Sequence, residues 1–212
     1  MKTNEQKNNG YGFTRQNFPQ KVSGGFTLVE VLISLLIFTV AITGVITVAS
    51  QGSLNVNNAK NRVAATFLAD EGIELVRAMR DTSVVRAVSG GRTESEGWDD
   101  FVMAHGAGTP CSTACDIDST NTASSDPFPD IANVQPCTIF CLLNETSTGY
   151  YTSFDTGTPS IFSRSIVLKD ATTGLDIIST TQEVRVESTV EWKEGLTTRS
   201  VTQTETLFNW YH

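Results

Sequence analysis

The pattern of apolar and polar residues divides the first fifty residues into a leader and a helix of membrane length. Residues 1–25 are polar and show no apolar periodicity, which is typical of a disordered segment. Residues 26–50 are almost entirely apolar, and at about 1.5 Å per residue a helix from Val31 to Ala49 spans roughly 28 Å, close to the thickness of a bilayer core. We therefore predict a leader over residues 1–25 and a transmembrane helix over residues 26–50.

Residues 51–81 predict an amphipathic helix that continues the membrane helix without a stop. Apolar residues recur mostly at intervals of three, four and seven, and charged residues fill the other faces. Gly72 lies inside this pattern at an expected cost of about 1 kcal/mol relative to alanine, and Gly90 and Gly91 end it. The apolar positions of the pattern are Leu54, Val56, Val63, Phe67, Leu68, Leu75, Val76 and Met79.

Residues 82–160 predict an irregular region, because glycine, proline and short polar residues recur there. This region contains all four cysteines of the chain. Two short apolar stretches within it, Ile139–Leu143 and Tyr150–Phe154, lie on either side of Glu145–Gly149 and predict a β-hairpin.

Residues 161–212 predict antiparallel strands. Apolar and charged residues alternate along 184–193, which is typical of a strand with one buried face. A turn at Lys193–Gly195 and a strand rich in Thr and Val complete a second hairpin. The predicted fold class is therefore α+β: a long N-terminal helix, membrane-spanning in its first half and amphipathic in its second, packed on a C-terminal antiparallel β-sheet.

Charge is distributed unevenly along the chain. Residues 1–25 hold four basic residues and one acidic residue, whereas the rest of the chain holds 11 basic and 22 acidic residues. A basic segment before an apolar run stays on the cytoplasmic side, so we expect the region after the helix to be extracytoplasmic. Its acidic character argues against nucleic acid as the main partner, since phosphate binding needs a basic surface.

The stretch from Gly24 to Glu30 combines features that an ordinary membrane helix does not need. Gly25 ends the basic leader, and a glycine gives a protease access to the backbone without a side chain in the way. Cleavage there would leave a new ammonium group on Phe26. Glu30 is the only charged residue between Lys21 and Lys60, and a carboxylate in an apolar helix requires a partner. The Phe26 amine, of the same chain or of a neighbour, is the expected partner, and a pair between chains would set their axial register.

These residues, GFTLVEVLIS from Gly25, resemble the processing signal of type IV prepilins and of type II secretion pseudopilins. The resemblance implies cleavage between Gly25 and Phe26, N-methylation of Phe26, and a charge pair between subunits at Glu30. Thr27 matches the residue that usually follows the phenylalanine. A looser resemblance over residues 65–74 and 206–210 is to minor pilins of the PilV kind.

The resemblance also implies the partners of the chain. A prepilin peptidase that is also a methyltransferase would process it, so the chain is expected to be a substrate and not an enzyme. Before assembly it would be a single-pass protein of the cytoplasmic membrane, in contact with the lipid bilayer and the inner-membrane assembly machinery. Afterwards it would pack with other pilin subunits in a filament at the cell surface. A filament of a type II secretion or DNA-uptake system is the alternative, because the processing signals are shared.

Two simpler interpretations of residues 1–50 explain fewer of these features. A secretory signal peptide has a shorter apolar core than this one, although Val48-Ala49-Ser50 could serve as a cleavage site. A single-span anchor carrying an extracytoplasmic binding domain explains the length of the helix. Neither interpretation accounts for Gly25-Phe26 or for Glu30.

The four cysteines, Cys111, Cys115, Cys137 and Cys141, form two pairs with three residues between the members of each pair. Zinc sites usually have two intervening residues, so in an exported domain two disulfides are favoured over a metal. Three connectivities are possible. Bridges between the two pairs would close loops worth about 3 kcal/mol each.

No other residues predict a metal, a cofactor or catalysis. Asp116, Asp118, Thr120 and Asn121 resemble part of a calcium loop, but its glycine and terminal glutamate are missing, and a solvated polar turn is favoured. His105 and His212 are the only histidines, and no nucleophile accompanies them at a suitable spacing.

Overall fold

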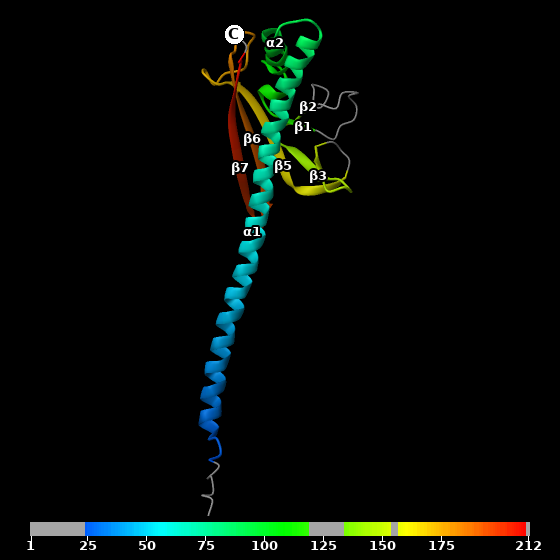
Figure 1. Cartoon of the computed structure of the whole chain (residues 1–212). Helices are drawn as coiled ribbons and strands as arrows, with labels where there is room; N and C mark the ends of the chain where they lie inside the picture. The colour runs from blue at the N-terminus through cyan, green and yellow to red at the C-terminus, as the bar shows by residue number, and fades with distance from the viewer. Residues whose placement is uncertain (1–23, 119–133, 154–156, 211–212) are drawn as a thin grey trace, which may run out of the picture. The chain divides into compact units, whose positions relative to one another are not determined.

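The computed structural model describes residues 24–118, 134–153 and 157–210 (Figure 1). Most of the predicted leader therefore lies outside the described residues. The chain divides into two compact units, residues 1–50 and 51–212, which share one helix, α1 (Leu28–Ser89). The observed bounds differ from the predicted ones, since α1 begins two residues after Phe26 and continues eight residues past residue 81.

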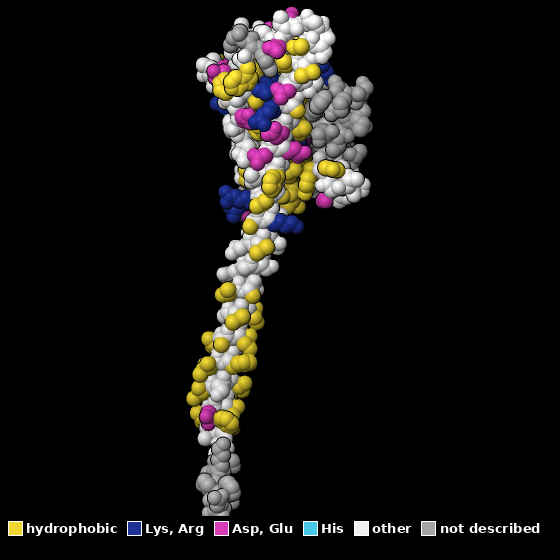
Figure 2. All heavy atoms as spheres, in the orientation of Figure 1, with side chains coloured by type: hydrophobic (Ala, Val, Ile, Leu, Met, Phe, Trp, Pro, Cys, Tyr) yellow, Lys and Arg dark blue, Asp and Glu magenta, His cyan; other side chains and the backbone are white. Residues whose placement is uncertain are grey.

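The first unit contains the apolar half of α1, in which every side chain from Leu28 to Ser50 is exposed. Hydrophobic side chains cover this half of the helix (Figure 2). Its hydroxyl groups bond to backbone carbonyl groups one turn earlier, as when Thr43 Oγ1 donates to Thr39 O at 2.7 Å and Thr47 Oγ1 to Thr43 O at 2.9 Å. Such bonds reduce the cost of placing a hydroxyl in lipid. Among the described residues, α1 contains the one stretch apolar and long enough to cross a membrane.

The second unit is the rest of α1 packed on an antiparallel β-sheet, so the predicted α+β class is confirmed. Leu68, Leu75, Val76 and Met79 are buried, as predicted for an apolar face. Val56, Val63 and Phe67 are instead exposed, and the side chain of Leu54 lies outside the described part of the structure. Small residues complete the buried face in their place. A periodicity judged mainly from large apolar residues does not reveal them. The buried apolar residues of α1 are Ala65, Leu68, Ala69, Ile73, Leu75, Val76, Met79, Val84 and Ala87.

The sheet is built around the long strand β5, which pairs with β6 along one edge, and β6 in turn pairs with β7. The other edge of β5 is shared by β3, opposite residues 158–164, and β1, opposite Ile166. The predicted hairpin around Glu145–Gly149 is confirmed as β3 and β4, and the alternating strand is confirmed as β6. The strands are β1 (Cys115–Ile117), β2 (Val134–Pro136), β3 (Cys141–Glu145), β4 (Tyr151–Thr152), β5 (Thr158–Asp170), β6 (Glu183–Glu194) and β7 (Thr197–Phe208).

The prediction that residues 82–160 are irregular was wrong in its first third. A second helix, α2 (Glu94–His105), follows α1, and a short 3-10 helix, η1 (Pro110–Ser112), follows α2. Thr93 starts α2 with a capping box: its hydroxyl accepts from the Glu96 N–H, while the Glu96 carboxylate accepts from the Thr93 N–H. The Thr-x-x-Glu spacing was the sequence signal for this helix. Its fully buried residues are Trp98, Phe101 and Val102.

Gly72 allows α1 to approach the sheet closely. A Cβ atom at this position would overlap Oγ of Ser188 on β6 and lie 3.3 Å from Cδ1 of Ile166 on β5. Ser188 is fully buried, and its Oγ has no hydrogen-bond partner in the described part of the chain. The helical pattern predicts that Gly72 weakens the helix. In the structure, Gly72 is instead the residue that allows the helix and the sheet to pack together.

We expect Gly72→Ala to destabilise the protein by about 1–3 kcal/mol, because overpacking outweighs the helix propensity gained. Thermal unfolding of the detergent-solubilised chain would measure this. Gly52→Ala on the same helix is the control, since no atom lies within 4 Å of its added Cβ. Ser188→Ala should recover part of the loss, and equal stability of the Gly72 and Gly52 variants would contradict the packing argument.

His105 is a buried titratable group at the end of α2. Its Nδ1–H donates to Phe101 O at 2.8 Å, and Nε2 has no partner among the described residues. Burial lowers the pKa of His105 below its ordinary value, and the bond to Phe101 opposes this only partly. A proton added to Nε2 would be a buried donor without an acceptor.

The stability of the fold should therefore fall as the pH drops below about 6.5, the pKa of an unfolded histidine. The folded state binds the proton less tightly than the unfolded state, so His105 costs no stability above this pH. Below it the loss is at most about 1.4 kcal/mol per pH unit until the folded pKa is reached. Unfolding curves of the wild type and of His105→Asn at pH 7.5 and 5.5 measure the difference, which we expect to shrink or vanish in the variant.

Candidate processing and assembly site

The peptide bond between Gly25 and Phe26 is exposed and lies outside regular secondary structure. Gly24 and Gly25 are exposed, and no atom lies within 4 Å of a Cβ built on either. The Phe26 side chain is 80% exposed. A protease binds its substrate as an extended backbone, so a helix across this bond would have to unwind first. In this chain the helix begins at Leu28, beyond the bond.

Thr27 caps the N-terminus of α1. Its Oγ1 accepts a hydrogen bond from the N–H of Glu30 at 3.2 Å, and its carbonyl oxygen accepts from the N–H of Val31 at 3.1 Å. These are the bonds that an N-cap threonine makes to the free N–H groups of the first turn. Thr27 was predicted only through the resemblance to prepilins, although Thr27-Leu28-Val29-Glu30 carries the Thr-x-x-Glu capping signal.

The Glu30 carboxylate is exposed in the first turn of α1 and has no hydrogen bond or ion pair within the described part of the chain. In a complete capping box it would accept from the Thr27 N–H, but only the bond from the Glu30 N–H to Thr27 is present. The positive end of the helix dipole favours a carboxylate here, although by less than a full charge pair would. Glu30 is therefore free to accept a cation from outside the described structure.

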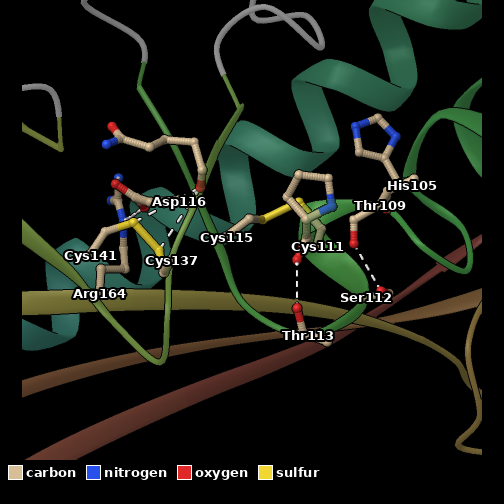
Figure 3. Close-up of a disulfide and its surroundings, with 12 residues drawn as sticks. His105, Thr109, Cys111, Ser112, Thr113, Cys115, Asp116, Cys137, Cys141 and Arg164 are labelled. Atoms are coloured by element: carbon tan, nitrogen blue, oxygen red, sulfur yellow. Dashed lines mark hydrogen bonds and ion pairs between the residues drawn. A yellow bond between two sulfur atoms is a disulfide. The ribbon is translucent and has the colours of Figure 1, made fainter.

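The cysteines form two local disulfides, Cys111–Cys115 and Cys137–Cys141 (Figure 3). The predicted disulfides are confirmed, and the zinc alternative does not apply to sulfur atoms bonded in this way. Each bridge closes a loop of five residues, worth about 2 kcal/mol in the loop-entropy model, less than bridges between the two pairs. The two bridges meet β5 two residues apart, because Cys115 pairs with Ile166 and Cys141 with Arg164.

A buried ion pair lies beside the second disulfide (Figure 3). Arg164 on β5 donates from Nε to Asp116 Oδ1 at 2.5 Å, and its Nη1 donates to Glu71 Oε2 at 3.0 Å and to Leu68 O at 3.1 Å, both on α1. Burial alone lowers the pKa of Arg164, but the charges and hydrogen bonds of Asp116 and Glu71 outweigh it and raise the pKa above its ordinary value.

Asp116 and Asp118 do not form the solvated turn that the sequence predicted. Asp116 is fully buried against Arg164, and the buried Asp118 accepts a hydrogen bond from Thr152 on β4. The prediction was wrong because the sequence does not show that the Arg164 side chain of β5 contacts Asp116. Thr120 and Asn121 lie outside the described residues.

Residues 20–46 match the family model of the prokaryotic N-terminal methylation motif. The match includes the exposed Gly25–Phe26 bond, the Thr27 cap and Glu30, and it supports a protein of the type IV pilin and pseudopilin family. Neither a functionally characterised protein nor a solved structure matches the chain significantly. The resemblance to PilV-like minor pilins therefore remains a prediction.

Proposed function

We propose that this chain is a minor pilin: a structural subunit that a prepilin peptidase cuts after Gly25 and that enters a filament through the first half of α1. The observation that carries the proposal is the methylation motif over residues 20–46, joined to an exposed cleavage position and an unpaired carboxylate at Glu30. The chain acts as the substrate of the processing enzyme and as a building block, and not as an enzyme.

Cleavage changes the electrostatics of the first helical turn. In the uncut chain the nitrogen of Phe26 is a neutral amide, and after cleavage it is an ammonium group. That cation lies next to the positive end of its own helix dipole, which disfavours it. The Glu30 carboxylate, four residues along the chain, supplies the opposite charge. A pair between neighbouring chains is favoured because it compensates both charges in apolar surroundings.

The first half of α1 offers a surface that suits lipid before assembly and other helices afterwards. It is apolar on all sides, and Glu30 is its only charged residue. Its hydroxyl groups already have acceptors on their own helix, so moving from lipid into a filament core leaves none of the described hydroxyls without a partner. In this half of the helix, Glu30 is then the one group whose unpaired charge raises the free energy of a subunit that is placed incorrectly in the filament.

The mass of the mature protein tests the processing step. We expect protein extracted from membranes to begin at Phe26 and to be about one methyl group heavier than the unmodified sequence from that residue. Gly25→Val should abolish the cut, because its side chain obstructs the protease at this position. A mature chain that begins at another residue would overturn the proposal.

Substitution of Glu30 tests the assembly step. Glu30→Gln keeps the shape of the side chain and removes its charge, so we expect normal cleavage and weaker incorporation into filaments. Loss of a buried pair of this kind costs on the order of 3 kcal/mol, or more than about a hundredfold in an equilibrium. Quantification of the chain in sheared filament fractions would measure the effect.

Asp70→Asn is the matched control, since Asp70 is an exposed carboxylate in the second half of the same helix. We expect this variant to enter filaments normally. Equal incorporation of the Glu30 and Asp70 variants would contradict the pairing role. Recovery of the wild-type chain only with the membrane, and never with sheared filaments, would favour a secretion or DNA-uptake filament over a surface pilus.

A further inference from the structure

A cleft within the second unit brings together polar side chains from α1, β6 and β7. One wall is the α1 segment 58–62 and the other is the base of the β6–β7 hairpin, and all of these residues belong to the second unit. The volume of the cleft is about 520 Å³, within the range of clefts that hold small organic ligands. The residues that line it are Asn58, Ala59, Arg62, Trp192, Glu194, Arg199 and Ser200.

Two buried polar atoms of the lining residues have no hydrogen-bond partner in the described part of the chain. Trp192 is 5% exposed, and its Nε1–H has no acceptor there. Oε1 of Glu194, on the same face of β6, has no donor, although Oε2 accepts from Arg199 Nε at 3.1 Å. Buried polar groups nearly always have a partner, and a hydroxyl group, which both donates and accepts, suits an N–H and a carboxylate oxygen together. Arg199 is 58% exposed, so its side chain can move aside to admit a ligand to these atoms.

The lining carries two guanidinium groups but only one carboxylate. Arg199 is paired with Glu194, whereas Arg62 is exposed and forms no ion pair among the described residues. The cleft therefore has one positive charge in excess, in a unit (residues 51–212) that holds 11 basic and 21 acidic residues. A guanidinium group binds a carboxylate through two parallel hydrogen bonds. One carboxylate matches this charge, whereas a phosphate monoester, with a charge of about −1.5 to −2, exceeds it.

We propose that this cleft binds a sugar acid, that is, a carbohydrate that carries one carboxylate. In this arrangement the carboxylate lies against Arg62, while a ring hydroxyl accepts from Trp192 Nε1–H and donates to Glu194 Oε1. The Asn58 amide lies one helical turn before Arg62 and can both donate and accept, so it suits a second hydroxyl. The site belongs to the second unit alone and requires neither processing nor assembly of the chain.

A carboxylate from another protein satisfies fewer of these groups than a sugar acid does. It accepts hydrogen bonds from Arg62 and Trp192, but it has no proton to donate to Glu194. It would also place a second negative charge beside that carboxylate without an intervening hydroxyl. A second copy of this chain is further disfavoured, because its second unit has the same excess of acidic residues and the two copies repel each other.

The test is an NMR titration of the full chain, labelled with ¹⁵N-tryptophan, in a detergent without a sugar headgroup. Galacturonate offers both a carboxylate and hydroxyls, galactose offers hydroxyls alone, and acetate offers a carboxylate alone. We expect galacturonate to bind roughly tenfold more tightly than galactose or acetate, since each of these lacks one set of hydrogen bonds. The Trp192 indole N–H signal, assigned by its loss in Trp192→Phe, should shift on binding. Trp98 is the internal control, because its Nε1–H already donates to Thr181 O at 2.9 Å.

Arg62→Gln tests the carboxylate position, with Lys60→Gln as the matched control. Lys60 is an exposed cation on the same helix that does not line the cleft. We expect Arg62→Gln to bind galacturonate no more tightly than galactose, and Lys60→Gln to bind it as the wild type does. Both positions are exposed, so the comparison holds whether or not Trp192→Phe folds. Acetate or glycerol 3-phosphate binding as tightly as galacturonate, equal shifts at Trp192 and Trp98, or an Arg62→Gln variant with unchanged affinity would each overturn the proposal.

Discussion

The second unit depends on the buried guanidinium group of Arg164. It joins three elements that are far apart in sequence, because it bonds to Asp116 on β1 and to both Glu71 and the Leu68 carbonyl on α1. Removing the buried Asp116 would leave the Arg164 charge in the core without its main partner, at a cost of about 3–5 kcal/mol. The pair thus fixes which turn of α1 faces which part of the sheet, and the close contact at Gly72 follows from that placement.

The position of α1 on the sheet determines which parts of the strands lie beside the helix in the second unit. Because the helix lies close to β6, the base of the β6–β7 hairpin and the helix residues Asn58, Ala59 and Arg62 line a cleft within the second unit. The disulfides act at the other edge of β5, where each closes a short loop before a strand, β1 or β3. They stabilise the way the chain enters these two strands and do not join distant parts of it.

The two halves of α1 suit different environments, and they differ in the charged residues that they carry. Beyond residue 60 the helix carries carboxylates and arginines that pair with one another or with the sheet, such as Arg77 with Glu205. Before residue 60 it carries Glu30 alone. In the apolar half, no described residue pairs with that carboxylate. Under the proposed function its partner is the amine of a cut chain end, so the processing step that creates this amine is also an assembly signal.

The sequence by itself determined the elements whose causes are local. The apolar run, the basic leader, Gly25-Phe26 and Glu30 lie within one short segment, and the family match covers that same segment. The α+β class and the β6 strand followed from periodicity, because a strand with one buried face alternates regardless of what covers it. The capping signals at Thr27 and Thr93 were also present in the sequence, although periodicity alone did not reveal them.

Only the tertiary structure decided features that join distant residues. From the sequence pattern, Gly72 is expected to weaken the helix and Asp116 is expected to be exposed. The same pattern allows three connectivities of the four cysteines. Each acquires its role from a residue on another strand, namely Ser188 for Gly72, Arg164 for Asp116 and β5 for the strands that follow the disulfides. Burial and pairing are properties of residues brought together by the fold, and no pattern along a single chain contains them.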